Sequence, residues 1–262
     1  MRIASRLLLN AYDYLVIYLG LAWLAVLCLA WTPVALVIYP LLSEQRGRAL
    51  GRRFTMAAFR FYLACLSLSR RFSFDLTALD ALRNEPALII APNHPSLLDA
   101  AMVISRLPNV ACVLKTELMN NVLFGAGARL ARYIRNVPVR RMVRQAVDDF
   151  DCGSHLLLFP EGTRTTRRPL NAFKGSIGLI ATHAQVPVQT VLIETDSLYL
   201  GKGWSLWRKP PMPIHYRLRL GRRFDPPQHT QHFMTELEQY FEHELAQSPA
   251  SSSDGTYANQ AD

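Results

Sequence analysis

The hydrophobic pattern begins with a long apolar run near the N-terminus. Residues 14–42 carry no charged side chain, and a helix needs about 20 such residues to cross a bilayer. The run therefore predicts a hydrophobic membrane-anchoring helical segment. Thr32-Pro33 interrupts it, and a proline inside a helix removes a backbone donor and favours a kink or a break. The segment is then either a single tilted span that ends near Trp31, with a short apolar piece behind it, or a helical hairpin that enters one leaflet and returns.

The pattern changes after residue 85, where short apolar runs alternate with helix-like segments. Strands are expected at 86–91, 110–114, 133–139, 155–159, 186–194 and 213–220, and helices at 97–107, 142–150, 176–184 and 230–245. Strands that alternate with helices predict an α/β fold, with a mostly parallel central sheet flanked by helices.

The chain therefore divides into three regions. Residues 1–60 are expected to form the membrane-anchoring helical segment, and residues 61–246 a globular catalytic domain. Residues 247–262 are rich in Ser, Ala, Gly and Asn and nearly devoid of large apolar side chains. Such a segment cannot bury enough apolar surface to offset the cost of ordering it, so this tail is predicted to be disordered.

The charge of the chain indicates an acidic partner, because the formal net charge is +9 and the isoelectric point is near 9.7. The basic residues crowd behind the apolar run, at Arg46, Arg48, Arg52, Arg53, Arg60, Arg70 and Arg71, whereas only Arg2 and Arg6 precede it. This bias places the following domain on the cytoplasmic face of the inner membrane. A basic stretch beside an apolar anchor is typical of contact with anionic lipids. Membrane lipids are therefore the expected partners, and nucleic acid is not, since no recognition module accompanies the charge.

The first candidate for chemistry is the segment Asn93–Asp99, directly after the first predicted strand. His94 lies in the strand-to-helix turn, and Asp99 lies about one turn into the helix that follows. A carboxylate bonded to one imidazole nitrogen fixes the tautomer and leaves the other nitrogen free to take a proton. A hydroxyl that attacks a thioester needs such a base. The alternative is an ordinary capped turn in which His94 satisfies the local backbone.

The second candidate is the segment Phe159–Arg164, Phe-Pro-Glu-Gly-Thr-Arg, at the end of the fourth predicted strand. A turn at this position directs Glu161 and Arg164 towards the strand-end cleft where α/β proteins usually bind ligands. The Arg164 guanidinium can bind a phosphate with two parallel hydrogen bonds. The alternative is a surface turn with a solvated ion pair.

Together, the H-x-x-x-x-D segment and the F-P-E-G-T-R segment resemble the lysophosphatidate/glycerol-phosphate acyltransferase family. Three further stretches are similar to elements of that family: Lys115-Thr116-Glu117-Leu118, Val137–Arg141, and Leu170–Gly175 with its L-x-x-F-K-x-G pattern. Val186-Pro187-Val188 resembles the family's fourth block, a V-P-[VI] strand. The resemblance runs from about Ala87 to Glu194, with the blocks in the family's order.

The resemblance implies a membrane-bound O-acyltransferase of the glycerolipid type. It implies transfer of a fatty acyl group from acyl-CoA or acyl carrier protein to the hydroxyl of a lysophospholipid, by default lysophosphatidate to phosphatidate. His94 is then the general base and Asp99 orients it. The substrate-binding residues are then Glu161, Gly162, Thr163, Arg164, Arg141 and Lys115. No cofactor and no metal are implied, since the acyl carrier is a co-substrate and thiolate is a good leaving group.

Departures from the family's pattern leave the acceptor open. Arg140 stands where the family often has an aspartate, and residues 120–125 only partly keep its usual proline and glycine. Acyl transfer to another acceptor, such as an amino-acid lipid or a specialised aryl or polyene lipid, is therefore an alternative. A non-catalytic lipid-binding membrane protein is another, against which the intact His94 and Asp99 pair speaks. Residues 199–212 mix aromatic and basic side chains, as either a membrane-interface loop or a packed loop does.

Overall fold

The computed structural model describes residues 2–167 and 169–247, and it confirms the predicted α/β architecture. Seven strands form one sheet in the order β1-β7-β6-β2-β5-β3-β4. Neighbouring strands are parallel except β6 and β7. The strands are β1 (Phe72–Asp75), β2 (Ile89–Pro92), β3 (Val110–Leu114), β4 (Ile134–Arg135), β5 (His155–Leu157), β6 (Val188–Thr195) and β7 (Ile214–Phe224).

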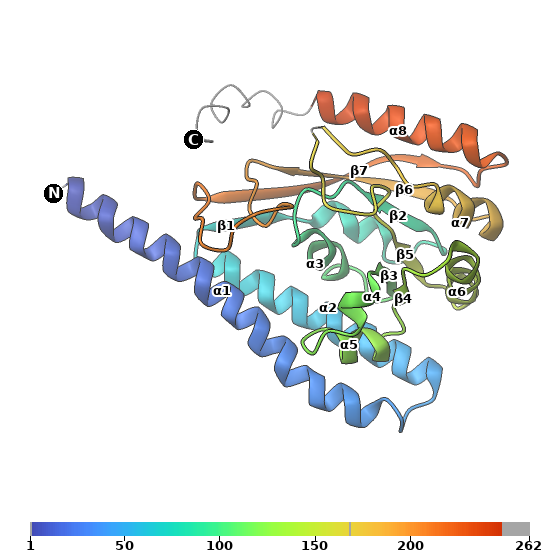
Figure 1. Cartoon of the computed structure of the whole chain (residues 1–262), viewed down its shortest axis with the longest axis horizontal. Coiled ribbons are helices and arrows are strands. Elements are labelled where there is room, and N and C mark those ends of the chain that lie inside the picture. The colour runs from blue at the N-terminus through green and yellow to red at the C-terminus, as the bar shows by residue number, and fades with distance from the viewer. Residues whose placement is uncertain (1, 168, 248–262) are drawn as a thin grey trace.

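Helices cover both faces of the sheet (Figure 1). On one face lie α1 (Arg2–Ile38), α2 (Glu44–Leu68) and α3 (Asp99–Ile104), and on the other lie α6 (Val139–Asp151), α7 (Ser176–Ala184) and α8 (Thr230–Ala246). Strand β2 contributes side chains to the hydrophobic cores on both faces of the sheet, because Ile90 packs with the first set of helices and Ile89 with the second. A strand buried on both faces reads as an unbroken apolar run, which is why β2 was visible in the sequence.

Several boundaries differ from the predicted ones. The strand expected at 133–139 is only the two-residue β4, because α6 begins at Val139 with Pro138 as its N-cap. The helix expected at 97–107 shortens to α3. The sequence pattern did not reveal β1, the 3-10 helix η1 (Thr77–Leu82), α4 (Thr116–Met119) or α5 (Gly125–Leu130). Each has six residues or fewer, too few for a periodic signal. The tail predicted to be disordered lies outside the described residues, apart from Gln247.

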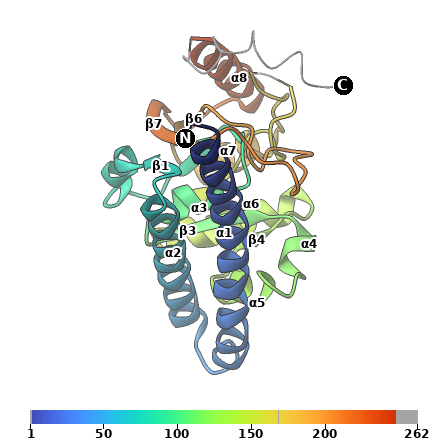
Figure 2. The same cartoon turned by 90° about the vertical axis from the view of Figure 1, so that its left-hand side faces the viewer.

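The apolar run forms one continuous helix, so the break expected near Thr32-Pro33 is wrong. Helix α1 has 37 residues and contains Pro33. The proline leaves one carbonyl of the preceding turn without its usual donor. The hydroxyl of Thr32 donates to the Cys28 carbonyl at 2.9 Å and lies 3.1 Å from the carbonyl of Val122, which ties this part of α1 to the domain. A turn then reverses the chain, and α2 returns beside α1 (Figure 2).

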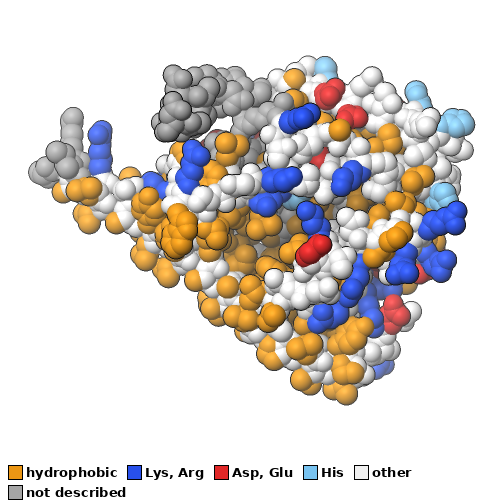
Figure 3. Space-filling view, viewed as in Figure 1, with side chains coloured by type: hydrophobic (Ala, Val, Ile, Leu, Met, Phe, Trp, Pro, Cys, Tyr) orange, Lys and Arg blue, Asp and Glu red, His pale blue; other side chains and the backbone are white. Residues whose placement is uncertain are grey.

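Helix α1 is long and apolar enough to cross a membrane, by length and composition, and few of its side chains are buried. Hydrophobic side chains line it from the N-terminal part to the turn before α2 (Figure 3). It contacts the domain near both ends. Asp13 forms ion pairs with Arg71 at 2.6 Å and Lys209 at 3.0 Å, and Ala35 packs in a cluster with Leu130.

Helix α2 joins α1 to the domain and runs across the boundary expected between residues 60 and 61. Arg52 of α2 is 1% exposed. Its guanidinium donates to the Ala131 carbonyl at 3.0 Å and to Ser154 at 2.7 Å, and it pairs with Asp149 at 2.8 Å. A buried charge is tolerated only when such partners surround it, so this network fixes α2 to the strands that carry the site.

Candidate active site

The candidate residues gather along the edge of the sheet where β2, β5, β3 and β4 end. These four strands are parallel neighbours, so their carboxyl ends face the same side. His94 follows β2, Glu161 follows β5, Lys115 follows β3, and Arg141 lies in the first turn of the helix after β4. This is the edge at which α/β sheets bind ligands.

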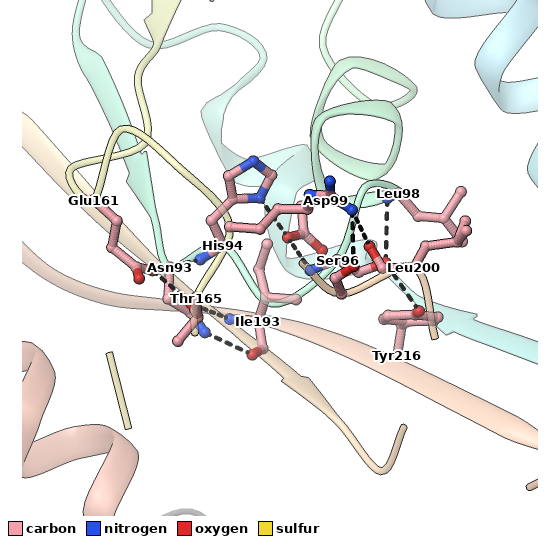
Figure 4. A network of polar contacts seen from close by, with 12 residues as sticks. Asn93, His94, Ser96, Leu98, Asp99, Glu161, Thr165, Ile193, Leu200 and Tyr216 are labelled. Carbon is pink, nitrogen blue, oxygen red and sulfur yellow. Dashed lines mark hydrogen bonds and ion pairs between the residues drawn. The ribbon is translucent and has the colours of Figure 1, made fainter. Parts of the chain in front are cut away.

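His94 and Asp99 form a hydrogen-bonded pair. The Nδ1 atom of His94 lies 2.8 Å from Oδ2 of Asp99, and the backbone amide of Ser96 donates to the same oxygen at 2.8 Å (Figure 4). The Asp99 side chain is completely buried, whereas 16% of the His94 side chain is exposed. Among the described residues, none forms a hydrogen bond with Nε2 of His94. The carboxylate therefore holds Nδ1 as the protonated nitrogen and leaves Nε2 available as a base.

The burial of Asp99 shapes its titration. Loss of solvent raises the pKa of Asp99, and the hydrogen bonds from His94 and Ser96 oppose that rise. The other oxygen, Oδ1, is buried without a hydrogen-bond partner in the described chain. The carboxylate therefore depends on His94 and Ser96 for its stabilisation as an anion.

Three contacts fix the turn that carries His94. The imidazole stacks on the Phe159 ring, with centroids 3.8 Å apart and planes 17° apart. Asn93 bridges to β6, where its amide donates to the Ile193 carbonyl at 3.0 Å and its oxygen accepts from the Ile193 amide at 2.7 Å. The Ser96 hydroxyl, which is fully buried, donates to the Tyr199 carbonyl at 2.9 Å. The His94 turn is thus held by packing and by hydrogen bonds to the backbone on both sides.

Glu161 lies inside this assembly and is 1% exposed. Its Oε1 accepts the His94 backbone amide at 3.0 Å and the Thr165 hydroxyl at 2.7 Å, and its Oε2 accepts the Asn171 amide at 2.9 Å. The Thr165 amide in turn donates to the His94 carbonyl at 2.7 Å. Both carboxylate oxygens are therefore occupied by the protein. Glu161 can shape an acceptor site only through the backbone that it holds.

The remaining residues of the Phe159–Arg164 turn surround Glu161. Gly162 has φ +64°, and a Cβ there would come within 2.6 Å of the Lys174 side chain, so both the conformation and the space favour glycine. Thr163 is partly buried. The Nη1 of Arg164 donates to the carbonyls of Leu200 at 2.7 Å and Gly201 at 2.9 Å. Among the described residues, none accepts a hydrogen bond from the other N–H groups of this guanidinium.

Lys115 and Arg141 are exposed at the same edge. Neither side chain has a hydrogen bond or an ion pair with another described residue. The structure thus brings His94, Asp99, Glu161 and Arg164 into one bonded group and leaves Lys115 and Arg141 as free cations farther along the strand order β2-β5-β3-β4.

Sequence reasoning did not single out Ser96, Thr165 or Asn171, all of which hold the base or Glu161. Ser96 lies between His94 and Asp99 in the sequence, and this position was a signal that it would contact their pair. Asn171 lies ten residues from Glu161, within a stretch with no regular secondary structure, and the sequence pattern carried no signal for it.

A cavity of about 430 Å³ elsewhere in the molecule is lined by Arg48, Arg53, Asn109, Cys152 and Ser154, among others. Asn109 and Ser154 precede β3 and β5, so the cavity opens at the opposite edge of the sheet from His94. Among the described residues, no three His, Cys, Asp or Glu side chains are grouped so that they could hold a metal ion. Neither feature moves the candidate site away from the pair of His94 and Asp99.

Comparison with known proteins identifies the domain. The acyltransferase family model matches residues 73–194, a span that contains the two candidate segments. This chain therefore carries a domain of the acyltransferase family, and the predicted acyltransferase is confirmed. Comparison with curated proteins gives no match.

A solved structure is similar over nearly the whole chain. It is the crystal structure of the 1-acyl-sn-glycerophosphate (LPA) acyltransferase PlsC from Thermotoga maritima. The TM-score is 0.64 and the sequence identity is 20%, and the match covers 94% of this chain and 96% of that chain. The likeness therefore includes the N-terminal helices as well as the sheet, and it shows a shared fold.

Proposed function

We propose that this protein transfers a fatty acyl group from a thioester carrier to the hydroxyl of a lysophospholipid, with lysophosphatidate as the default acceptor. The observation that carries the proposal is the pair of Nδ1 of His94 and Oδ2 of Asp99, 2.8 Å apart, with Nε2 free at the ligand-binding edge. The match to the acyltransferase model and the likeness to a lysophosphatidate acyltransferase support the substrate class.

In the proposed reaction, Nε2 of His94 takes the proton of the acceptor hydroxyl as its oxygen attacks the thioester carbon. A tetrahedral oxyanion forms, and its collapse breaks the carbon–sulfur bond. The departing thiolate takes the proton back from His94, so the enzyme returns to its starting state. Asp99 stabilises the transient imidazolium. The reaction forms one ester and one thiol, and no cofactor or metal enters the balance.

The acidic headgroup of the acceptor is proposed to lie against the cations of this edge. Nη1 of Arg164 is held by the carbonyls of Leu200 and Gly201, and the other N–H groups of this guanidinium, which no described residue accepts, are proposed to bind the phosphate. Lys115 and Arg141 are exposed and have no partner among the described residues, so binding a phosphate would disturb no bond within the described part of the chain. A planar guanidinium binds a phosphate with two hydrogen bonds, which makes Arg164 the residue of greatest expected effect.

We propose that α1 and the start of α2 anchor the protein in one leaflet of the inner membrane, with the domain on the cytoplasmic face. Asp13 and Ala35 contact the domain near opposite ends of α1, and they lie 22 residues apart, which is about 33 Å of helix. A helix perpendicular to the membrane would carry one of these contacts across the hydrocarbon core. A helix close to the membrane plane exposes its apolar face to lipid and keeps both contacts.

The test is the transfer of a labelled acyl group from acyl-CoA and from acyl carrier protein to lysophosphatidate, with the full chain in detergent. Wild type is compared with His94→Ala and with the control His232→Ala, which changes an exposed histidine of α8. Activity should vanish in the His94 variant and persist in the control. Loss of a general base typically costs about 10²–10⁴-fold in rate.

The outcomes separate the alternatives. Transfer to another lipid that excess lysophosphatidate does not suppress would assign a different acceptor and keep the mechanism. A folded wild type that binds lipid vesicles but transfers nothing from either donor to any lipid tested would make the protein a lipid-binding one. Equal activity in His94→Ala and wild type would overturn the assignment of the base.

A further inference from the structure

A loop between β6 and β7 exposes large apolar side chains at its tip. It comprises residues 196–213 and is called loop 196–213 below. Trp207 is 82% exposed and its neighbour Leu206 is 55% exposed. Contiguous apolar patches at a protein surface mark contact with lipid or with another protein, and these two side chains adjoin the exposed apolar side chains of α1.

The loop adjoins α1. The Trp207 ring lies 6.4 Å from the Tyr18 ring, and Lys209 pairs with Asp13 at 3.0 Å. Lys209 also lies over the Tyr14 ring, 5.9 Å from its centroid. Tyr14 and Tyr18 belong to the apolar face of α1 that is proposed to lie in lipid. Trp207 therefore extends that face onto a second element of the chain.

The charge of the loop favours lipid over an apolar protein partner. Lys202 and Arg208 are exposed, and neither forms an ion pair with a described residue. Arg208 lies over the Trp204 ring, 5.2 Å from its centroid. Tryptophan beside cations is the composition found at the level of lipid headgroups, where the ring takes the apolar side and the cations meet phosphate.

The start of loop 196–213 is hydrogen-bonded to the turn after β2, which carries His94, and to the turn after β5, which carries Glu161 and Arg164. The Leu200 carbonyl accepts the Leu97 amide at 3.1 Å and the Arg164 guanidinium at 2.7 Å. The Tyr199 carbonyl accepts the Ser96 hydroxyl at 2.9 Å. Leu200 has φ +57°, a conformation that costs a non-glycine residue about 1 kcal/mol or more, and here it is retained where its carbonyl meets two donors.

We propose that loop 196–213 is a second lipid-contacting surface, with Trp207 and Leu206 inserted at the interface of a bilayer and Lys202 and Arg208 on anionic headgroups. Because the same loop holds Arg164, its seating in lipid sets the orientation of that guanidinium. The headgroup of the acceptor lipid then meets an Arg164 side chain that is already oriented, at the point where the acceptor enters the protein from the membrane. The lipid contact rests on the exposed surface of the loop and on the proposed membrane position of α1, and only its effect on turnover rests on the proposed acyl transfer.

The contact is tested without turnover. The full chain is reconstituted in vesicles that contain phosphatidylglycerol and lipids brominated at a shallow acyl position, and quenching of tryptophan fluorescence is measured. Wild type is compared with Trp207→Phe and with the matched variant Trp204→Phe, which removes a partly buried tryptophan of the same loop. The lipid-quenched emission should fall in Trp207→Phe and change little in Trp204→Phe.

Two results would overturn the lipid contact. One is an equal change in the two variants. The other is a Trp207 emission that aqueous acrylamide quenches in vesicles as fully as in denaturant. Concentration-dependent self-association, lost in Leu206→Ser/Trp207→Ser, would assign the surface to a second copy of the chain instead.

The effect on turnover is measured separately with Leu206→Ser/Trp207→Ser. Transfer to a long-chain acceptor in vesicles should fall about 5- to 20-fold, whereas transfer to a short-chain acceptor dissolved in water should stay near the wild-type rate. Equal losses on both acceptors would mean that the loop acts by folding rather than by lipid contact. If wild type transfers no acyl group to either acceptor, the proposed function is wrong. The quenching result would still test the lipid contact by itself.

Discussion

The backbone amide of His94 donates a hydrogen bond to Oε1 of Glu161 at 3.0 Å, although 67 residues separate them in sequence. The glutamate thereby joins the turn after β2 to the turn after β5. Since its carboxylate is buried and its oxygens are occupied, Glu161 is a positioning residue for the base.

Glu161→Gln should lower both the rate and the stability. One oxygen becomes an NH₂ group that faces an N–H or O–H donor, and a buried donor left without a partner costs about 1–3 kcal/mol. We expect kcat to fall, while the KM for the acceptor changes little. Steady-state kinetics and denaturant unfolding in detergent check both effects.

Thr165→Val is the matched control for Glu161, because it removes only the hydroxyl that donates at 2.7 Å. Its loss of stability should be the smaller one. A Glu161→Gln variant with wild-type kcat and unfolding, and a raised KM alone, would instead mean that the carboxylate contacts the acceptor.

Asp99→Asn should reduce kcat by about 10³–10⁴-fold. An asparagine can donate to Nδ1 of His94 and so favours the tautomer in which Nε2 carries the proton, which removes the base. The double variant with His94→Ala should be no slower than the slower single variant, because both residues act as one unit. Additive losses would contradict the pairing.

The same substitution tests the burial of Asp99. Burial raises its pKa above the ordinary value of 3.8, so the folded state holds a proton that the unfolded state has lost. The wild type therefore loses stability as pH rises from about 3.8 through the raised pKa, and Asp99→Asn should lack this loss. Unfolding curves measured at increasing pH from pH 4 should show the variant gaining on the wild type until the pH passes the raised pKa of Asp99. A constant difference between the two would refute the shift.

His155 should make the protein sensitive to acid. Burial lowers the pKa of this histidine below its ordinary value of 6.5, so the unfolded state takes up a proton that the folded state does not. Stability should therefore fall as pH drops below about 6.5, by at most about 1.4 kcal/mol per pH unit from this group. His155→Gln keeps a donor for the Leu82 carbonyl, which His155 contacts at 2.9 Å, and should show a flatter curve. An unchanged pH dependence would contradict the prediction.

Gly51→Ala should loosen α2 from the domain. A Cβ at Gly51 would lie 2.6 Å from the backbone nitrogen of Ala131, and backbone atoms cannot move aside as a side chain can. We expect a loss of about 1–3 kcal/mol in unfolding free energy. Gly47→Ala on the same helix is the control, because its nearest neighbour is the Leu130 side chain at 3.4 Å. It should be neutral or gain up to about 1 kcal/mol from helix propensity, and equal losses at both sites would contradict the packing argument.

The sequence by itself determined the elements whose burial is local and periodic. The strand at 110–114 and the helix at 176–184 have the predicted bounds, because the apolar side chains of each segment show which of its residues must be buried. The spacing of His94 and Asp99 allowed a contact between the two side chains, since a turn followed by one helical turn brings them together, but by itself it left an ordinary capped turn as an alternative. The short β1 and α4 were not predicted, because so few residues cannot show a periodic pattern of apolar side chains.

Only the tertiary structure decided what lies against what. It placed Glu161 under His94, Arg52 beside Asp149, and Arg164 on the carbonyls of loop 196–213. Such bonds join residues far apart in sequence, and they depend on the order of the strands, which no local pattern encodes. The continuity of α1 through Pro33 was decided in the same way. A proline destabilises a helix locally, and contacts with the rest of the chain determine whether the helix continues through it.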